Sequence, residues 1–326
     1  MGTETRSLDA KTLGLLAAAR RGEKYALGRL ISLAERDDAS SRGHRIALFH
    51  HLAAHPTEFP HAARVVGFTG TPGAGKSTLI GALVLALLEQ DPTVRVAVLA
   101  VDPSSQRSGG ALLGDRLRTR FPVGEPRVFF RSQATRGDVG GLGRRTYAAA
   151  RLLAHFFDLI LIETVGIGQS EIEVTHLADL TILVLQPLAG DHVQFLKAGV
   201  MEVPDVFVVN KCDVDELARR SYHELRSALG VAKVEGGVEA RIFQTSATTG
   251  RGIPELARFL GDLARAPQDA AGARRKAEFF LRKAVAERYG RFGVTELERH
   301  LGRLADGAVY EEVEAEALAA IEALVR

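Results

Sequence analysis

The stretch Gly70-Thr-Pro-Gly-Ala-Gly-Lys-Ser77 decides the fold of this chain of 326 residues. It follows an apolar run at 64–69 and precedes a second apolar run from Thr78 to Leu88. A strand-like run, a glycine-rich loop and a helix-like run form the context in which the spacing GxxxxGKS makes a phosphate-binding loop. A glycine-rich turn that fits the spacing by chance is the alternative, and the runs on both sides argue against it. The stretch therefore predicts that the chain binds a nucleoside triphosphate.

Each residue type in this loop has a physical role. Glycines lack a Cβ, so the backbone can adopt positive φ and turn its N–H groups onto a β-phosphate. The helix that starts near Lys76 adds the positive end of its dipole. Lys76 is expected to contact the β- and γ-phosphates, and the Ser77 hydroxyl is expected to bind magnesium. The predicted nucleotide-binding residues of the loop are Gly70, Thr71, Pro72, Gly73, Ala74, Gly75, Lys76, Ser77 and Thr78.

The composition indicates a protein with no strongly charged partner. The chain has 42 basic and 40 acidic side chains, so its net charge of +2 favours neither nucleic acid nor an anionic membrane. We interpret basic clusters at 116–120 and 144–145 as solvated faces rather than partner-binding patches. A single cysteine, Cys212, excludes intramolecular disulfides and suits a reducing cytosol. The longest apolar stretch, Leu79 to Leu88, is too short to span a bilayer, so we expect a cytoplasmic protein.

The middle of the chain alternates strand and helix, which predicts an α/β fold. We expect a P-loop NTPase with a mostly parallel sheet, covered by helices on both faces. The predicted strands are residues 64–69, 94–101, 127–131, 158–163, 180–186, 205–210 and 241–245, and helices are expected at 144–156, 191–201, 215–229 and 253–264. Binding sites in such sheets lie at the carboxyl ends of the strands.

Helical segments are predicted on both sides of this domain. Residues 1–60 form an N-terminal helical extension, with helices at 11–20, 23–35 and 43–54, followed by a nucleotide-binding domain at 61–266. Residues 267–326 form a C-terminal segment with helices at 270–289, 294–304 and 309–325. The apolar faces of these last helices need a partner, either the N-terminal helices or a second subunit. Five of the ten histidines lie between His44 and His61, but their spacing matches no standard metal-ligand pattern.

Glu163 is the first candidate for a magnesium ligand other than Ser77. It ends an otherwise apolar strand, where its carboxylate can hold the ion directly or through water. Three residues later, Gly166 can present its N–H to the γ-phosphate, so 163–166 is similar to a DxxG switch with Glu in place of Asp. A carboxylate that only caps the strand is the alternative. Asp102 and Asp115 are further candidates, although carboxylates at strand ends are also common turn formers.

A second motif predicts which base is bound. Asn210-Lys-Cys-Asp213 follows a strand and matches the NKxD element of GTPases. Asp213 can accept hydrogen bonds from the N1–H and N2–H₂ groups of guanine, which adenine does not offer. Lys211 is expected to pack over the base and Asn210 to tie the motif to the phosphate-binding loop. Ser246 and Ala247 match the element whose backbone N–H meets guanine O6, so GTP and GDP are the predicted ligands.

The residue after Gly166 is Ile167, where GTPases of the Ras type carry the glutamine that orients the attacking water. Isoleucine cannot do this, so we expect slow intrinsic hydrolysis that a partner or a second subunit accelerates. Gln169 lies close enough in sequence to substitute. Lys76, Glu163 and Gly166 are the predicted catalytic residues.

These motifs together resemble the methylmalonyl-CoA mutase-associated GTPases, the MeaB, ArgK and MMAA type of the SIMIBI class. The resemblance rests on the phosphate-binding loop, Val101-Asp-Pro-Ser-Ser105 with Gly109-Gly110 and Gly114-Asp115, Glu163-Thr-Val-Gly-Ile-Gly-Gln-Ser-Glu171, and Asn210-Lys-Cys-Asp213. It covers essentially the whole chain. Gln186-Pro-Leu-Ala-Gly differs from the family's usual Leu-Pro-Gly-Ala-Gly, and the loop at 132–138 also differs.

The resemblance implies more than the residues alone do. It places Asp102, Asp115 and Glu163 with Ser77 around magnesium, and it implies nucleotide-sensing switches at 102–115, 163–171 and 186–197. It also implies a homodimer that is a chaperone of an adenosylcobalamin-dependent acyl-CoA mutase, gating cofactor loading and protecting the mutase. The isobutyryl-, ethylmalonyl- and hydroxyisobutyryl-CoA mutases are possible clients beside methylmalonyl-CoA mutase.

Three other classes of function remain open from the sequence. A metal-insertion GTPase of hydrogenase or urease maturation shares this fold but usually carries Cys and His ligands, whereas Cys212 lies inside the base-recognition motif. A protein kinase linked to amino-acid transport would transfer phosphate to a protein, and no acceptor-positioning base is evident. A binding module without catalysis is disfavoured by the intact set Lys76, Ser77 and Glu163.

Overall fold

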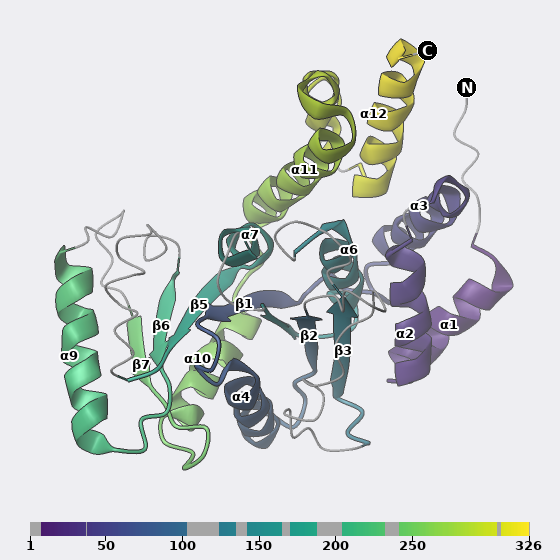
Figure 1. Cartoon of the computed structure of the whole chain (residues 1–326). Helices are drawn as coiled ribbons and strands as arrows, with labels where there is room; N and C mark the ends of the chain where they lie inside the picture. The colour runs from purple at the N-terminus through teal and green to yellow at the C-terminus, as the bar shows by residue number, and fades with distance from the viewer. Residues whose placement is uncertain are drawn as a thin grey trace. The chain divides into compact units, whose positions relative to one another are not determined.

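The computed structural model describes residues 8–36, 38–102, 124–134, 142–164, 170–187, 204–231, 241–304 and 308–325. The chain divides into two compact units (Figure 1). The sheet unit comprises residues 63–143 and 157–266, and the helical unit comprises residues 1–62, 144–156 and 267–326. Residues 144–156, which we predicted as a helix between two strands of the sheet, therefore group with the helices from the two ends of the chain.

The sheet unit contains a parallel seven-stranded sheet in its described part, which confirms the predicted α/β fold class. The strand order is β3-β2-β4-β1-β5-β6-β7, and every pair is parallel. The strands are β1 (Arg64–Gly70), β2 (Val96–Asp102), β3 (Val128–Ala134), β4 (Leu159–Glu163), β5 (Leu180–Leu185), β6 (Val206–Val209) and β7 (Arg241–Gln244). Because β4 and β5 flank β1, their carboxyl ends meet where β1 enters the glycine-rich loop.

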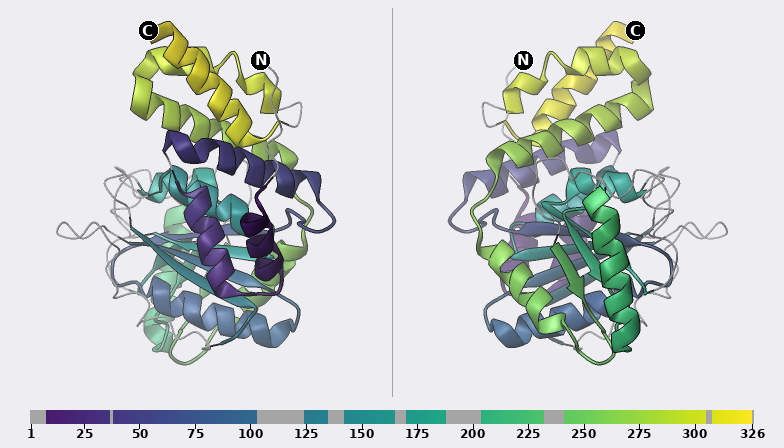
Figure 2. Two further views of the ribbon diagram at one scale, coloured as in Figure 1. Left: turned by 90° about the vertical axis from the view of Figure 1, so that its right-hand side faces the viewer. Right: turned by 90° about the vertical axis from the view of Figure 1, so that its left-hand side faces the viewer.

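Alternating side chains of the strands build two separate apolar layers. In β5, Ile182 and Val184 belong to the core under helices α4 (Lys76–Gln90) and α10 (Ile253–Arg265). Leu183 and Leu185 point to the other face and join the core under α9 (Asp215–Val231). Successive side chains of a strand point to opposite faces, so a strand buried on both sides must be apolar throughout. Figure 2 shows these helices on the two faces of the sheet.

Helix α7 (Ser170–Leu177) also packs on the sheet, and the sequence analysis did not predict it. Its Val174 is fully buried, and a Cβ built on Gly67 of β1 would lie 2.4 Å from the Val174 Cγ2 atom. Gly67 therefore brings the helix close to the strand. The eight-residue segment carries mainly polar side chains, so it lacks the apolar periodicity that predicted the longer helices.

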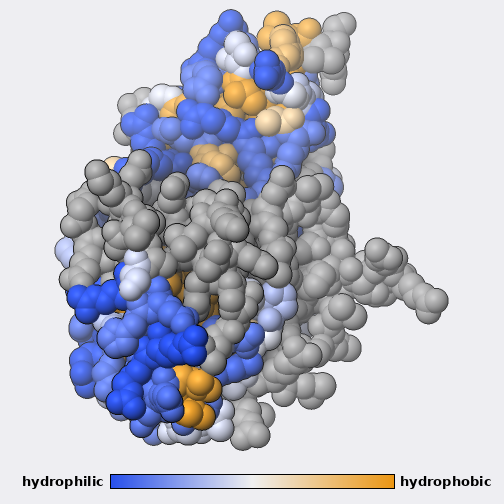
Figure 3. Space-filling view, turned by 60° about the vertical axis from the view of Figure 1, so that its left-hand side comes forward, coloured by the Kyte–Doolittle hydropathy of each residue, from blue (hydrophilic) through white to orange (hydrophobic). Residues whose placement is uncertain are grey.

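The outer surface of α9 is mostly hydrophilic (Figure 3). This agrees with its sequence, in which pairs such as Arg220 and Glu224 lie one turn apart on the exposed face. Val214 and Leu217, at the start of the helix, are the exposed large apolar side chains of this segment, at 55% and 38%. Isolated apolar side chains of this kind are normal on protein surfaces.

The helical unit contains α1 (Ala10–Arg20), α2 (Lys24–Ala34), α3 (Ala39–Ala54), α6 (Arg144–Leu153), α11 (Ala270–Leu297), a 3₁₀ turn (Leu301–Leu304) and α12 (Tyr310–Val325). Three predicted boundaries were wrong, one of them the end of α6, which stops at Leu153 rather than at residue 156. Helix α3 begins four residues before the predicted start, because Asp38 caps it by accepting a hydrogen bond from the Ser41 N–H at 2.9 Å. The predicted helix at 294–304 is instead the end of α11, after a kink at Gly290, followed by the 3₁₀ turn. None of the described helices has the length and apolar character needed to cross a membrane.

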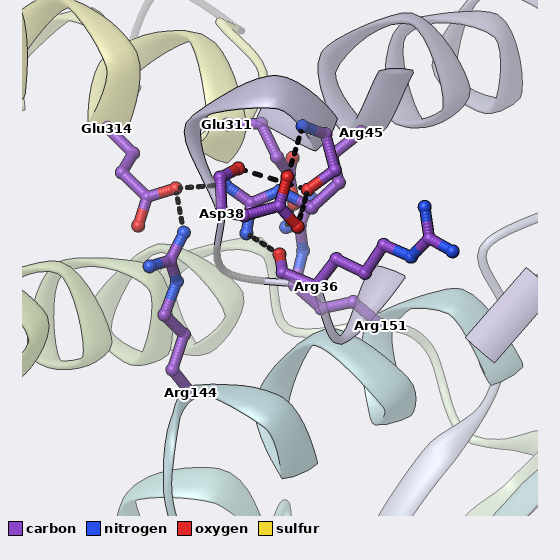
Figure 4. Close-up of polar contacts among 8 residues, drawn as sticks. Arg36, Asp38, Arg45, Arg144, Arg151, Glu311 and Glu314 are labelled. Carbon is purple, nitrogen blue, oxygen red and sulfur yellow. Dashed lines mark hydrogen bonds and ion pairs between the residues drawn. The ribbon is translucent and has the colours of Figure 1, made fainter. Parts of the chain in front are cut away.

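Buried ion pairs join three helices of this unit (Figure 4). The Glu314 carboxylate of α12 lies 3.2 Å from the Arg45 guanidinium of α3 and 2.6 Å from that of Arg144 on α6. Next to it, Arg151 of α6 pairs with Glu311 of α12 at 2.5 Å. Both carboxylate side chains are less than 5% exposed. Removing one member of a buried pair leaves an uncompensated charge and costs about 3–5 kcal/mol, so these pairs fix the arrangement of α3, α6 and α12.

The stability of the helical unit is expected to fall in acid because of His155. Its Nδ1 atom lies 2.9 Å from the Phe59 carbonyl oxygen, and its ring packs edge-on against His61. Burial lowers the pKa of His155 to about 4, with His61 and Arg151 acting in the same direction. An exposed histidine has a pKa of about 6.5, so the folded state gains this stability fully above that pH and loses it as the pH falls toward 4. The loss is at most about 3 kcal/mol.

Urea unfolding at several pH values measures this effect in the wild type and in His155→Asn. The asparagine amide nitrogen can replace Nδ1 as the donor to Phe59 but does not titrate. Between pH 7 and pH 4, which spans the two pKa values given above, the wild type should lose more stability than the variant. Equal losses would show that His155 does not titrate between these values.

Candidate functional site

The loop between β1 and α4 contains two glycines at positions where any side chain would clash. Gly70 ends β1 with φ at +134°, and a Cβ there would lie 2.0 Å from the Val184 carbonyl oxygen of β5. Gly75 precedes α4 with φ at +86°, and a Cβ there would lie 2.7 Å from the Asn210 side-chain nitrogen. The backbone thus passes too close to its neighbours for any side chain. This close approach leaves the first N–H groups of α4 at the carboxyl edge of the sheet.

Lys76 is 7% exposed and lies over the loop that precedes it. Its ammonium group donates to the Gly70 carbonyl oxygen at 2.7 Å and to the Thr71 carbonyl oxygen at 3.2 Å. A buried ammonium group held at a helix start creates a strongly positive point. The loop therefore has the charge and the donors that a phosphate chain needs.

Ser77 and Glu163 meet across the first turn of α4. The Ser77 hydroxyl donates to the Glu163 carboxylate at 2.6 Å, and Glu163 is 7% exposed. Phe68 of β1 and Ala100 of β2 pair with Glu163, so Asp102 ends the neighbouring strand two residues further on. Hydroxyl and carboxylate oxygens are the donors that magnesium takes, so the donor set fits this ion. Asp115 and Gly166 lie outside the described residues, as do Ile167 and Gln169.

The NKxD motif is held by side-chain contacts to two other loops. The Asn210 amide donates to the Ala74 carbonyl oxygen at 2.9 Å and accepts from the Thr245 hydroxyl at 3.1 Å. Lys211 adopts a left-handed conformation, with φ at +60°. The Asp213 carboxylate accepts from the Ser246 hydroxyl at 2.7 Å, and Ala247 follows in the same loop. The structure therefore brings the phosphate-binding loop, residues 210–213 and residues 245–247 together.

Arg251 is a structural member of this site that the sequence analysis missed. Its guanidinium donates to the Cys212 carbonyl oxygen at 3.2 Å and pairs with Asp215. Its own carbonyl oxygen accepts from the Ser246 N–H at 2.9 Å. These contacts tie the turn after β7 to the NKxD motif. The glycines at 250 and 252 signal a tight turn, but the sequence does not reveal which side chain bridges it.

The thiol of Cys212 is a buried structural group. It is 1% exposed and donates to the Val209 carbonyl oxygen at 3.1 Å. Burial raises the pKa of the Cys212 thiol, although Arg251 acts in the opposite direction. Metal binding and nucleophilic attack need the thiolate form. The geometry at Cys212 therefore favours a packing role.

Lys211 also contacts the start of the segment that the family resemblance implies as a third switch. Its ammonium group donates to the Gln186 side-chain oxygen at 3.1 Å. Gln186 follows β5 directly, and residues 188–197 of the implied switch lie outside the described residues. The neighbouring sequence differs from the family's usual pattern at this glutamine. The contact is therefore a feature of this chain's own sequence.

A sequence model of the methylmalonyl Co-A mutase-associated GTPase MeaB matches residues 27–291 of this chain. The chain belongs to this family. A protein of Pyrococcus horikoshii named as a GTPase is 42% identical over 246 residues, which cover 74% of this chain and 74% of that protein. The MeaB-family match spans the whole sheet unit and part of the helical unit. This protein is accordingly a GTPase that binds guanine nucleotides.

Two relatives carry more specific names. The GTPase ArgK of Escherichia coli is 38% identical over 198 residues, covering 59% of this chain and 58% of that protein. The mouse methylmalonic aciduria type A homolog, a mitochondrial protein, is 42% identical over 195 residues, covering 59% of this chain and 46% of that protein. Among solved structures, the LAO/AO transport system kinase has a TM-score of 0.64 at 24% identity, over 96% of this chain and 98% of that one. This last likeness shows that the two proteins share a fold.

Two glycine substitutions in the phosphate-binding loop should differ sharply. Gly70→Ala places a Cβ 2.0 Å from a strand carbonyl oxygen, so it should destabilise the sheet unit by about 4 kcal/mol or more and abolish GTP binding. Gly73→Ala meets no atom within 4 Å and pays only for its positive φ of +83°, which costs about 1–2 kcal/mol. Thermal unfolding and GTP titration of both variants measure this difference. Equal losses would contradict the close approach at Gly70.

Proposed function

We propose that this GTPase is a chaperone of an adenosylcobalamin-dependent acyl-CoA mutase, gating cofactor loading and protecting the mutase. The observation that carries the proposal is the family match, because its description names methylmalonyl-CoA mutase and it extends from residue 27 to residue 291. Helices α3 and α6 lie inside the matched region, so the match includes helices outside the nucleotide-binding fold. A segment shared across the family beyond the nucleotide site is where a common partner would be recognised.

In this proposal the predicted site residues keep their roles. Asp213, fixed by Ser246, accepts the guanine N1–H and N2–H₂ donors, and Lys211 covers the base. Lys76 binds the β- and γ-phosphates. The Ser77 hydroxyl and the Glu163 carboxylate would hold magnesium together with Asp102 and Asp115. Magnesium, when bound, would neutralise charge on the phosphate oxygens.

Slow hydrolysis and a second subunit complete the proposal. Ile167 cannot orient a water molecule, so the mutase is proposed to complete the site and to accelerate hydrolysis. The C-terminal segment at 267–326 is proposed to form the homodimer. A metal-insertion GTPase is the competing class, and the buried Cys212 thiol, with its raised pKa, argues against it.

Asp213→Asn tests the reading of the base. Asparagine has nearly the same shape, and its side-chain oxygen can still accept from Ser246, so the loop should remain folded. Its amide N–H₂ group would face the N–H donors of guanine and could not accept from them, so GTP affinity should fall by about a hundredfold or more. The affinity for xanthosine triphosphate should rise. Titration with both nucleotides measures the switch. Asp262→Asn is the matched control, because that carboxylate lies on α10, is 71% exposed and pairs with Arg265 of the same helix. An unchanged preference in Asp213→Asn would mean that the base is read elsewhere.

The chaperone role is tested by GTP hydrolysis with and without a mutase from the same source. The purified protein alone should turn over GTP slowly and ATP not at all. Adding an adenosylcobalamin-dependent acyl-CoA mutase should raise the GTP rate by about tenfold or more, as expected when a partner completes a catalytic site. A rate that no such mutase changes would leave the GTPase in place and reject the chaperone role, with metal insertion as the next class to examine.

A further inference from the structure

A pocket lies at the end of the sheet opposite to the phosphate-binding loop. It has a volume of about 610 Å³ and lies among the end of α4, the start of β2 and helix α10. It is lined by Arg95, Arg258 and Arg265 beside Asp91 and Asp158, and by apolar residues that include Leu87. Pockets of about 300–1,000 Å³ with a few polar groups over an apolar floor are the usual size for small-molecule sites.

The two carboxylates of this pocket already accept hydrogen bonds from the protein. Asp91 accepts from the Thr93 N–H at 2.8 Å, from the Thr93 hydroxyl at 2.6 Å and from Arg265 at 2.7 Å. These bonds lower the pKa of Asp91 to about 2. Asp158 accepts from the backbone N–H of Arg95 at 2.8 Å. Both acidic groups are thus engaged in holding the rim of the pocket.

Arg95 and Arg258 are in a different situation. The Arg95 guanidinium stacks over the Phe157 ring at 5.2 Å from its centroid and donates no hydrogen bond within the described ranges. Burial lowers the pKa of Arg95, and the nearby Asp158 charge offsets this only in part. Arg258, exposed on α10, likewise has no side-chain hydrogen bond or ion pair to a described residue. Neither guanidinium is committed to an acceptor in the described part of the chain, so both can donate to a ligand that replaces the water around them.

We propose that this pocket binds a small molecule that carries a phosphate group. The two guanidinium groups come from separate parts of the chain, the residue just before β2 and the middle of α10. Each presents a planar fork that suits two oxygens of one anion. A single carboxylate has two oxygens and satisfies one fork, whereas a phosphate has enough oxygens for both. The net charge of the five ionised groups is +1, from three arginines and two aspartates, which also favours an anion.

The pocket is separate from the GTP site. Its Arg95 and Asp158 directly precede β2 and β4, whereas Asp102 and Glu163 end the same strands. Seven residues of strand correspond to roughly 20 Å, so no single nucleotide phosphate reaches both ends of the sheet. The proposed ligand therefore binds independently of GTP, and the test below keeps the GTP site filled.

Isothermal titration of the full chain, saturated with magnesium and a non-hydrolysable GTP analogue, tests the site. The probes are inorganic phosphate and glycerol 3-phosphate, with citrate as the carboxylate comparison, at constant ionic strength. We expect binding of at least one phosphate probe, and a loss of about tenfold or more in affinity in both Arg95→Gln and Arg258→Gln. Arg220→Gln removes an equal charge from the exposed face of α9 and should leave affinity unchanged.

Arg95→Gln loses the contact with Phe157 and could therefore be less stable. Arg95→Lys is the second test, because it keeps the positive charge but lacks the planar guanidinium group. It should also bind the phosphate probe more weakly than the wild type. Thermal unfolding of each variant confirms that it is folded. Three results would each overturn the proposal. The first is no binding of either phosphate probe up to about 10 mM. The others are equal affinity in the wild type and both arginine variants, and binding of citrate alone.

Discussion

The Asn210 side chain is the contact on which the nucleotide site depends. Its amide nitrogen donates to the Ala74 carbonyl oxygen and its oxygen accepts from the Thr245 hydroxyl, so one planar group joins three loops. Asn210 is 2% exposed, and each of these bonds would be costly to leave unmade. Gly75 must lack a Cβ because the same amide nitrogen occupies that space. The spacing between phosphate recognition and base recognition is therefore set by hydrogen bonds within the protein before any nucleotide binds.

The sequence predicted most of this site because its motifs encode local backbone geometry. A glycine-rich loop between an apolar strand and a helix, and Asn-Lys-Cys-Asp at the end of another strand, identify themselves by spacing. The Asn210 contact to the phosphate-binding loop was also expected, and it is present. Arg251 was not predicted, because its partners Cys212 and Asp215 lie more than thirty residues away and an arginine in a turn has many possible acceptors. Contacts of long side chains depend on tertiary packing, which spacing does not encode.

The same distinction separates correct from incorrect predictions in the fold. All seven strands were predicted within about three residues of their ends, because a parallel strand covered on both faces must be a continuous apolar run. Helix α7 was missed because only Val174 and Leu177 are buried among its described side chains, which gives too little apolar periodicity to predict a helix. The start of α3 was misplaced because the polar residues at 36–42 look like a break, although Asp38 within that stretch supplies a strong cap. Local capping prevailed over composition there.

Helix α6 belongs to the helical unit although it lies between two strands of the sheet in the sequence. The chain leaves the sheet unit after β3, forms α6 and returns to begin β4, which ends at Glu163. Within the helical unit, α6 is fastened to α12 by the Arg144–Glu314 and Arg151–Glu311 pairs, whose carboxylates are buried. Loss of either carboxylate would leave a buried charge without its partner. Strands β3 and β4 are therefore connected through α6, and α6 is held in place by its ion pairs with α12. A GTPase domain cut from this chain at 61–266 would keep α6 but lose both carboxylates that pair with it.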